Sequence, residues 1–242
     1  MSRKLSPFFP FPTPNVRATF LARPQRFLVR AKLENGEFTR SYCANPGSLA
    51  GCLRQGSQII LWESPVKTRR CAHTWRAIKL SRTWVGTDTH LANRLVRKAI
   101  EEGRIASLKG FSLSKAEPRT KEGRLDFLLK RENDLCFVEV KSATVACGKS
   151  AQFPDSLSPR AVRHLCSLKT QAEAGHRAVL VFVAQRGDVT SLCINHQFDP
   201  KFSAAMAEAL AAGVEVVALK FAVTPQGFRA PVAIPFRIAD LT

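Results

Sequence analysis

The sequence predicts an α/β (α+β) protein in two parts, a basic β domain at residues 1–84 and an α/β domain at residues 85–242. Two observations lead to this prediction. Short runs of alternating apolar and polar residues fill the first part, and such runs are typical of strands in a small barrel or curled sheet. Helical periodicity begins near residue 89, and helices then alternate with apolar strands, which indicates a sandwich with a mixed sheet flanked by helices.

Charge separates the two parts as well. The 242 residues carry a formal net charge of +18, which favours a polyanionic partner such as nucleic acid. Residues 1–100 hold 18 lysines and arginines against 4 acidic residues, a net charge of +14, whereas residues 101–242 hold 19 against 15, a net charge of +4. We therefore expect the first part to supply most of the attraction to nucleic acid, and we expect binding to weaken with salt.

The cysteines and the hydropathy of the sequence indicate the cellular compartment. The seven cysteines are odd in number and form no Cys-x-x-Cys pair, as expected of reduced thiols. No apolar run is long enough to cross a membrane, and Met1–Lys4 lead into a segment rich in proline and phenylalanine rather than a signal core. A cytoplasmic protein without a membrane partner is expected, and the oligomeric state stays open.

In the first part, residues 1–15 predict an irregular arm, because they contain four prolines and three phenylalanines. Strands are expected from Phe20 onward, at 26–33, 38–43, 57–62, 72–80 and 84–86, with Asn35-Gly36 as a hairpin turn. These strands and their loops carry the cations that we expect to contact nucleic acid: Arg26, Arg30, Lys32, Arg40, Arg69, Arg70, Arg76 and Lys79.

Aromatic residues are interleaved with these cations, namely Phe27, Tyr42, Trp62 and Trp75. A basic barrel that carries aromatic side chains is one way in which proteins hold single strands. The alternative, which we favour for most of the four, is that the aromatic rings form the core and that only the cations face the nucleic acid.

In the second part, the periodicity predicts helices at 89–102, 158–175 and 199–212, and strands at 178–185, 191–195 and 214–223. Asp88 or Thr89 can cap the first helix, and Gly103 can end it. Arg94 on the first helix and Arg160 at the start of the second are further candidates for nucleic-acid contacts.

Two strands of the second part carry charges. Leu125–Leu129 contains Asp126, and the apolar, β-branched segment Cys136–Ser142 contains Glu139 and Lys141. Side chains alternate along a strand, so Glu139 and Lys141 point to the same side. If the two strands pair through the polar turn at 130–135, all three charges converge.

Two carboxylates beside a lysine are the parts of a divalent-metal site for phosphodiester chemistry. The acids supply the oxygen ligands that Mg²⁺ prefers, and Mn²⁺ is an alternative. The lysine orients a water molecule or stabilises charge on the phosphate. The competing interpretation is a structural ion pair between Glu139 and Lys141.

The same segments, in this order, resemble the PD-(D/E)xK nuclease superfamily. More narrowly, the chain resembles the sugar fermentation stimulation protein A family over nearly its whole length. The motifs that carry this resemblance are Arg26-Phe27-Leu28, Cys43-Ala44-Asn45-Pro46-Gly47, His73-Thr74-Trp75, Ala92-Asn93-Arg94-Leu95, Arg124-Leu125-Asp126-Phe127, Val138-Glu139-Val140-Lys141-Ser142, Phe153-Pro154-Asp155 and Arg160 with His164-Leu165.

The resemblance implies an N-terminal OB-like β-barrel and a C-terminal PD-(D/E)xK nuclease-like domain. It implies that Asp126 and Glu139 are metal-binding acids and that Lys141 is the catalytic lysine. Many relatives in the superfamily also place an acid on the first helix, where this chain has Asn93. Glu117 is expected to supply a third carboxylate if its segment lies beside Asp126.

Two functions follow as hypotheses. The first is a DNA-binding protein, regulatory for sugar (maltose) metabolism, that holds single- or double-stranded DNA largely through phosphate contacts. No helix-turn-helix pattern for reading the major groove is present. The second is a Mg²⁺-dependent endonuclease with Asp126, Glu139 and Lys141 as its catalytic residues. RNA is an alternative partner for both, because phosphate contacts do not distinguish it from DNA.

Overall fold

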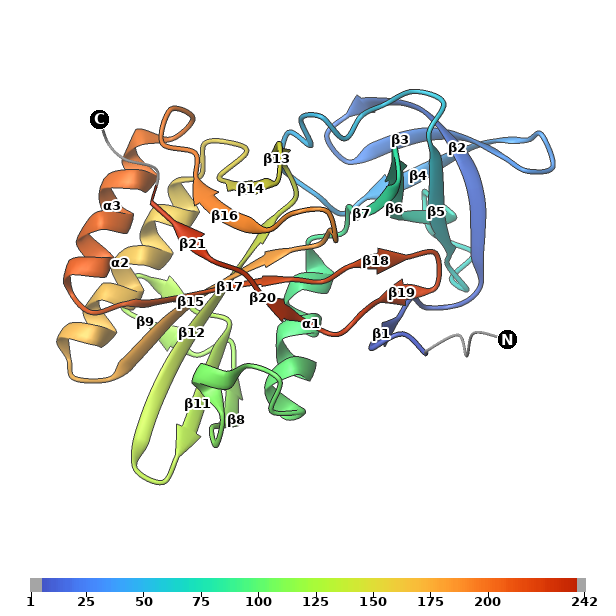
Figure 1. Ribbon diagram of the computed structural model, residues 1–242. Helices are drawn as coiled ribbons and strands as arrows, with labels where there is room; N and C mark the ends of the chain where they lie inside the picture. Colours follow the sequence, from blue (N-terminus) through green and yellow to red (C-terminus); the bar gives the residue numbers. More distant parts are fainter. Residues whose placement is uncertain (1–5, 239–242) are drawn as a thin grey trace. The chain divides into compact units, whose positions relative to one another are not determined.

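The computed structural model describes residues 6–238 and contains two compact units (Figure 1). Unit 1 comprises Met1–Leu91, Gln185–Asp188 and Phe221–Ala230, and unit 2 comprises Ala92–Ala184, Val189–Lys220 and Pro231–Thr242. The chain therefore returns twice from unit 2 to unit 1. Part of the predicted N-terminal arm, residues 1–5, lies outside the described residues.

Unit 1 contains a closed barrel of five strands, in the order β2-β3-β4-β6-β5. Strand β5 pairs with both β6 and β2, which closes the ring. The OB-like barrel expected from the sequence is thereby confirmed. Its strands are β2 (Asn15–Gln25), β3 (Leu28–Leu33), β4 (Phe38–Cys43), β5 (Gln58–Glu63) and β6 (His73–Leu80).

The barrel forms because every strand sends alternate apolar side chains inward. Phe20 and Trp75 stack at its centre with ring centroids 5.4 Å apart, and both are fully buried. The turn at Asn35-Gly36 joins β3 to β4 as predicted, and Gly36 adopts φ +90° there. Strand β2 begins at Asn15, earlier than the sequence suggested, and its first residues, Asn15–Thr19, pair with β5.

Four short strands extend this sheet beyond the barrel. They are β7 (Thr83–Gly86), β18 (Val223–Thr224), β19 (Gly227–Phe228) and β1 (Phe9–Pro10), in that order from β6. Phe11, just after β1, packs edge-on against Phe228 with the ring centroids 5.2 Å apart. The N-terminal arm is therefore held by a hairpin that lies more than 200 residues later in the sequence.

Unit 2 is built on a mixed sheet, as predicted. The central strands β12, β15 and β17 run parallel to one another, and antiparallel strands flank them. The order across the sheet is β20 (Val232–Ala233), β17 (Glu215–Lys220), β15 (Arg177–Ala184), β12 (Asp134–Ala143), β11 (Phe127–Arg131) and β8 (Ser112–Ala116).

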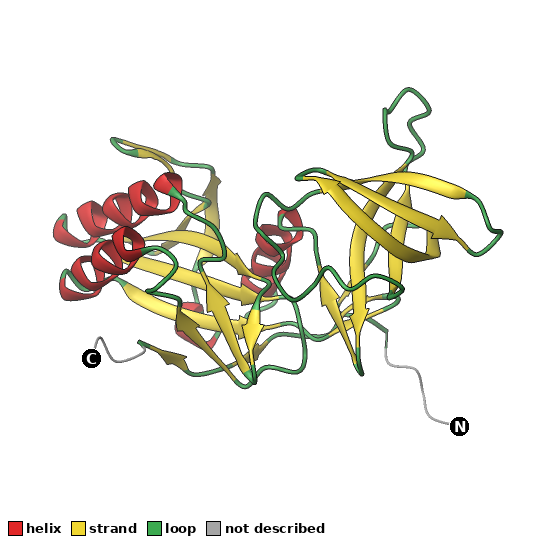
Figure 2. Cartoon of the chain, turned by 90° about the horizontal axis from the view of Figure 1, so that it is seen from above, coloured by secondary structure: helices red, strands yellow, loops and turns green. Residues whose placement is uncertain are grey.

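The three α-helices of the described residues are α1 (His90–Glu101), α2 (Pro159–Glu173) and α3 (Pro200–Ala211), within one or two residues of the predicted bounds; a short 3-10 helix covers Ala106–Leu108. Side chains cap the last two helices: Ser158 accepts from Ala161 N at 3.2 Å, and Asp199 accepts from Phe202 N at 3.1 Å. Helices α2 and α3 lie side by side on one face of the sheet, and α1 lies on the other (Figure 2).

Short strands complete unit 2. One small sheet contains β13 (Ala146–Cys147), β14 (Ser150–Phe153), β16 (Ser191–Ile194) and β21 (Phe236–Arg237), and a hairpin contains β9 (Arg119–Thr120) and β10 (Gly123–Arg124). The β9–β10 hairpin leads directly into Asp126. Within residues 6–238 no helix is long and apolar enough to cross a membrane.

Candidate functional site

Strands β11 and β12 bring Asp126 and Glu139 together. The two strands pair antiparallel through a tight turn, with Phe127 opposite Val138. Asp126 lies just before β11, and its backbone N donates to Val138 O at 3.1 Å. Its side chain reaches across to Val140 N, which donates to Asp126 Oδ2 at 2.7 Å. The acid of one strand thus lies beside the Glu-x-Lys segment of the other.

Glu139 and Lys141 share one face of β12. Phe137, two residues earlier, packs in the core cluster that includes Leu165 and Leu168 of α2, so this face of β12 is the one that α2 covers. Lys141 Nζ donates to Glu139 Oε1 at 2.5 Å. The side chain of Glu139 is 3% exposed and that of Lys141 is 12% exposed, so this ion pair is buried.

His164 of α2 completes the cluster. His164 is buried, with only 7% of its surface exposed. Arg160 Nε donates to His164 Nε2 at 3.3 Å, so the proton of a neutral imidazole lies on Nδ1. Nδ1 hydrogen-bonds to Glu139 Oε1. Helix α2 thus fixes the orientation of Glu139 through a side chain one turn inside the helix.

The two acids have opposite electrostatic environments. Burial, with the nearby charge of Glu139, raises the pKa of Asp126 from 3.8 to about 6, against hydrogen bonds from Val140 N and from Asn93 Nδ2 at 2.5 Å. Burial also acts to raise the pKa of Glu139, but the charge of Lys141 and the hydrogen bond from His164 prevail and lower it. Glu139 is therefore ionised at neutral pH, and the ionisation of Asp126 costs free energy.

One oxygen of the cluster lacks a partner. Glu139 Oε1 accepts from both Lys141 and His164, whereas Glu139 Oε2 is buried and has no hydrogen-bond partner among the described residues. A buried carboxylate oxygen without a partner costs free energy, so native proteins usually explain it by a bound ion or water.

These residues fit a hard divalent cation held by few protein ligands. No group of three or more His, Cys, Asp or Glu within residues 6–238 is placed to hold a metal ion. Mg²⁺, however, commonly uses one or two carboxylates and takes its other ligands from water and substrate phosphate. A cation would provide a partner for Glu139 Oε2, and it would favour the ionised form of Asp126, whose pKa is raised.

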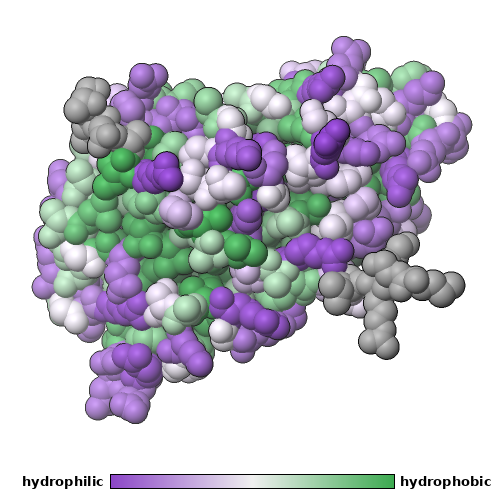
Figure 3. Space-filling model, in the orientation of Figure 1, coloured by the Kyte–Doolittle hydropathy of each residue, from purple (hydrophilic) through white to green (hydrophobic). Residues whose placement is uncertain are grey.

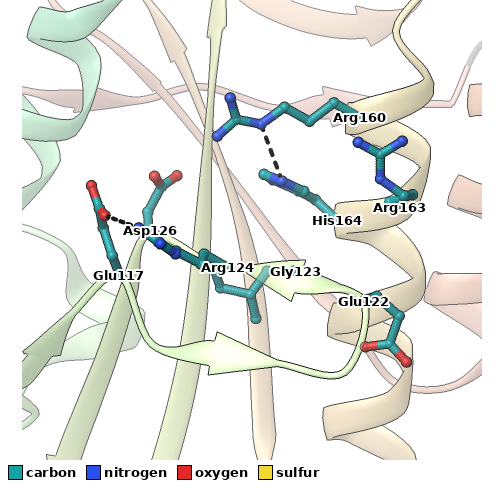
Figure 4. A pocket seen from close by; sticks show the side chains of 9 residues that line it. Glu117, Glu122, Gly123, Arg124, Asp126, Arg160, Arg163 and His164 are labelled. Carbon is teal, nitrogen blue, oxygen red and sulfur yellow. Dashed lines mark hydrogen bonds and ion pairs between the residues drawn. The ribbon is translucent and has the colours of Figure 1, made fainter.

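A cavity of about 340 Å³ opens on the Asp126 side of the cluster (Figure 4). Arg160 and His164 project into it from α2, and Asp126 and Glu117 approach from the strands. Glu117 N donates to Asp126 O at 2.9 Å, so its segment lies beside Asp126. The Glu117 carboxylate, however, is paired with Arg124 at 3.2 Å. The cavity has room for a phosphate group between acids and arginines.

The cations predicted in unit 1 lie mostly on its surface. Arg26, Arg30, Lys32, Arg40, Arg70 and Lys79 are exposed, and Arg69 is half-buried. Figure 3 shows hydrophilic side chains distributed over β2–β5 of this unit. Arg76 was wrongly expected on this surface: it is 7% exposed and forms an ion pair with the buried Asp88. Asp88 compensates the buried charge of Arg76.

The two predicted arginines of the second part lie on helices. Arg94 is exposed on α1, and Arg160 is exposed at the start of α2, where it lines the site cavity. Arg160 therefore belongs with Asp126 and His164 rather than with the cations of the barrel.

Comparison with known proteins agrees with this architecture. Residues 21–87 match the family model described as the SfsA N-terminal OB domain, and residues 90–227 match the sugar fermentation stimulation protein RE domain. The chain belongs to the sugar fermentation stimulation protein family. Homologues in this family include one from Geotalea uraniireducens, 39% identical over 89% of this chain and 94% of its own, and one from Geobacter metallireducens, 38% identical over 93% and 97%.

A solved structure of the family has the same fold. The Pyrococcus furiosus SfsA structure, a complex with Ca²⁺, is 27% identical and superposes with a TM-score of 0.87 over 96% of this chain and 99% of that one. The sequence resemblance to this family and the fold class that it implied are thereby confirmed.

Sequence reasoning missed two polar partners of the site. Asn93 was noted only as the residue that replaces an acid on α1, yet its amide holds Asp126 Oδ1 at 2.5 Å. The spacing of Arg160 and His164, one helical turn apart on α2, could have indicated that both side chains point to the same place.

Proposed function

We propose that this member of the sugar fermentation stimulation protein family binds DNA through phosphate contacts made by unit 1. The observation that carries this proposal is the placement of Arg30 directly opposite Arg40 in the β3–β4 ladder, with both side chains exposed. Like charges in such a pair destabilise a sheet. Among residues 6–238 neither arginine forms an ion pair with an acid, so a polyanion would provide the missing compensation.

The rest of the surface supports the same partner. Lys32, opposite the exposed Phe38, follows Arg30 on the outward side of β3, so a row of cations lines this hairpin. Backbone phosphates of DNA recur along each strand at intervals that such a row can follow. A regulatory role in sugar (maltose) metabolism is part of this proposal, and it is supported by the family to which the chain belongs.

Binding is tested by titrating the protein against labelled duplex and single-stranded DNA between about 50 and about 200 mM salt. The variants Arg30→Gln and Arg40→Gln are expected to weaken binding to all sequences alike, each reducing the slope of log affinity against log salt by about one. Lys169→Gln serves as the control, because Lys169 already pairs with Glu208. Equal slopes in all proteins, or no binding by the unmodified protein, would overturn the proposal.

A second candidate function is a Mg²⁺- or Mn²⁺-dependent nuclease in unit 2, acting on DNA or RNA. The unpartnered, buried Oε2 of Glu139 beside Asp126 favours it. The Ca²⁺ complex of the Pyrococcus furiosus relative supports a divalent ion in this chain as well. A divalent cation bound by Asp126 and Glu139 would stabilise charge on the phosphate and lower the pKa of a water molecule.

The chain's own residues would then have distinct roles. Lys141, held at Glu139 by its 2.5 Å hydrogen bond, would orient the attacking water. Arg160, which lines the cavity, would bind the phosphate. His164 would keep Glu139 Oε1 fixed so that Oε2 faces the metal. Glu117 can add a third carboxylate only if its pair with Arg124 opens.

Cleavage of single-stranded, duplex and branched DNA, and of RNA, with Mg²⁺, Mn²⁺ or EDTA tests this second function. Metal-dependent cleavage that Glu139→Gln and Lys141→Met both abolish would establish it. Glu208→Gln is the matched control, and we expect it to retain the activity, because Glu208 is exposed, lies outside the site and is paired with Lys169. Failure to cleave any substrate would leave a DNA-binding protein with a site put to another use.

A further inference from the structure

A groove on the surface of unit 1 combines aromatic and cationic side chains. It has a volume of about 290 Å³, and its lining includes Phe27, Leu28, Tyr42, Arg40, Arg69 and Arg70 but no acidic residue. Its apolar part is a pair of rings: Phe27 and Tyr42 lie with centroids 6.3 Å apart and an angle of 24° between their planes. Phe27 is 47% exposed and is therefore an exception to the expectation that most of the four aromatic residues are core.

The backbone that carries the rings is firmly held. Arg23 Nη2 donates to Arg26 O and to Asn45 O, both at 2.7 Å, and so ties the turn before Phe27 to a second loop. Phe27 O accepts from Cys43 N at 3.0 Å, which fixes Phe27 against β4 beside Tyr42. An exposed aromatic ring on a rigid turn loses little entropy when a ligand stacks on it.

The cations around the rings are available to a ligand. Arg70 is exposed, as is Arg40, and neither forms an ion pair among residues 6–238. Arg69 is held in place by Thr74 Oγ1 at 3.3 Å and lies over the Trp62 ring, 5.8 Å from its centroid. A flat, uncharged surface flanked by three guanidinium groups is complementary to a nucleobase with its neighbouring phosphates.

We propose that this groove is a subsite for one unpaired base of single-stranded DNA, which stacks on Phe27 and Tyr42 while Arg40, Arg69 and Arg70 hold the adjoining phosphates. The proposal rests on the proposed DNA binding and makes it specific, because a base inside a duplex is stacked on its neighbours and cannot present a face to the groove. Single strands are therefore the preferred ligand.

Fluorescence anisotropy with labelled thymidine oligonucleotides of about 20 nucleotides, and with a duplex of equal length, tests the preference. Phe27→Leu removes the aromatic face and keeps the apolar volume. It is expected to weaken single-strand binding by about 5- to 150-fold, because stacking contributes about 1–3 kcal/mol per base, and to leave duplex binding within about twofold. Phe27→Trp keeps an aromatic face and should therefore bind single strands more tightly than Phe27→Leu does.

Phe198→Leu is the matched control, since Phe198 is 45% exposed and lies in unit 2. The thermal unfolding midpoint of each variant verifies that it is folded. If the unmodified protein binds DNA but Phe27→Leu behaves like the control, the groove proposal is overturned and DNA binding stands. If the unmodified protein binds neither ligand at low salt, both proposals fail.

Discussion

At the residue scale, the feature that most affects the site is the difference between the electrostatic environments of Asp126 and Glu139. Asp126 is buried next to the ionised Glu139, and its pKa rises to about 6. A group whose native pKa exceeds its ordinary value of 3.8 destabilises the fold once it ionises, and the loss develops between pH 4 and pH 6. The free-energy cost is at most about 3 kcal/mol at neutral pH.

We therefore predict that Asp126→Asn stabilises the metal-free protein. The amide can keep both hydrogen bonds, because the Asn93 amide can turn to present its oxygen. Thermal unfolding in EDTA should show a midpoint several degrees higher for the variant above about pH 7, and the advantage should disappear toward about pH 4.

Asn93→Asp provides the opposite change and is the control for this experiment, since it places a further carboxylate at Asp126 Oδ1. It should lower the midpoint at neutral pH. A midpoint for Asp126→Asn that is unchanged at every pH would contradict the electrostatic account of this residue.

At the element scale, local patterns explain what could be predicted. The Asn35-Gly36 turn, the helix at Pro159–Glu173 and the shared face of Glu139 and Lys141 on β12 depend on neighbours in the sequence, and the structure has all three. The burial of His164 could not be predicted, because it depends on how α2 packs on β12. The pairing of Phe9–Pro10 with Gly227–Phe228 is equally non-local.

The pairing of β1 with β19 leads to a prediction about stability. Gly227 adopts φ +144°, and a Cβ there would overlap Phe9 O and lie 2.7 Å from Pro10 Cα. Gly227→Ala should therefore lower the free energy of unfolding by about 2 kcal/mol or more, as measured by chemical denaturation. Gly123→Ala is the control, because Gly123 has φ +150° and no atom within 4 Å of its Cβ position. Equal losses would assign the whole effect to backbone strain.

At the scale of the whole molecule, the net charge of +18 has two consequences of opposite sign. Salt screens the repulsion among the cations and so favours the folded chain, but it also weakens the attraction to DNA phosphates. We predict that raising NaCl from about 50 to about 200 mM raises the thermal unfolding midpoint while it reduces DNA affinity.

Differential scanning fluorimetry and anisotropy on the same samples measure both responses. The net charge is +14 for residues 1–100 and +4 for residues 101–242, so cations of the first part should dominate both. A midpoint that falls with NaCl would show that favourable ion pairs, such as Arg177 with Glu215 at 2.6 Å, outweigh the repulsion.

The return of the chain to unit 1 also sets an order of events during synthesis. Among residues 6–238, strand β1 pairs with β19 alone, and β19 ends at Phe228. A ribosome adds about 5–20 residues per second, so the partner strand of Phe9 and Pro10 is synthesised roughly 10–45 s after these two residues. The five barrel strands, complete by Leu80, can close long before this. Strand β1 is thus made before the barrel strands but is among the last to reach its place in the sheet.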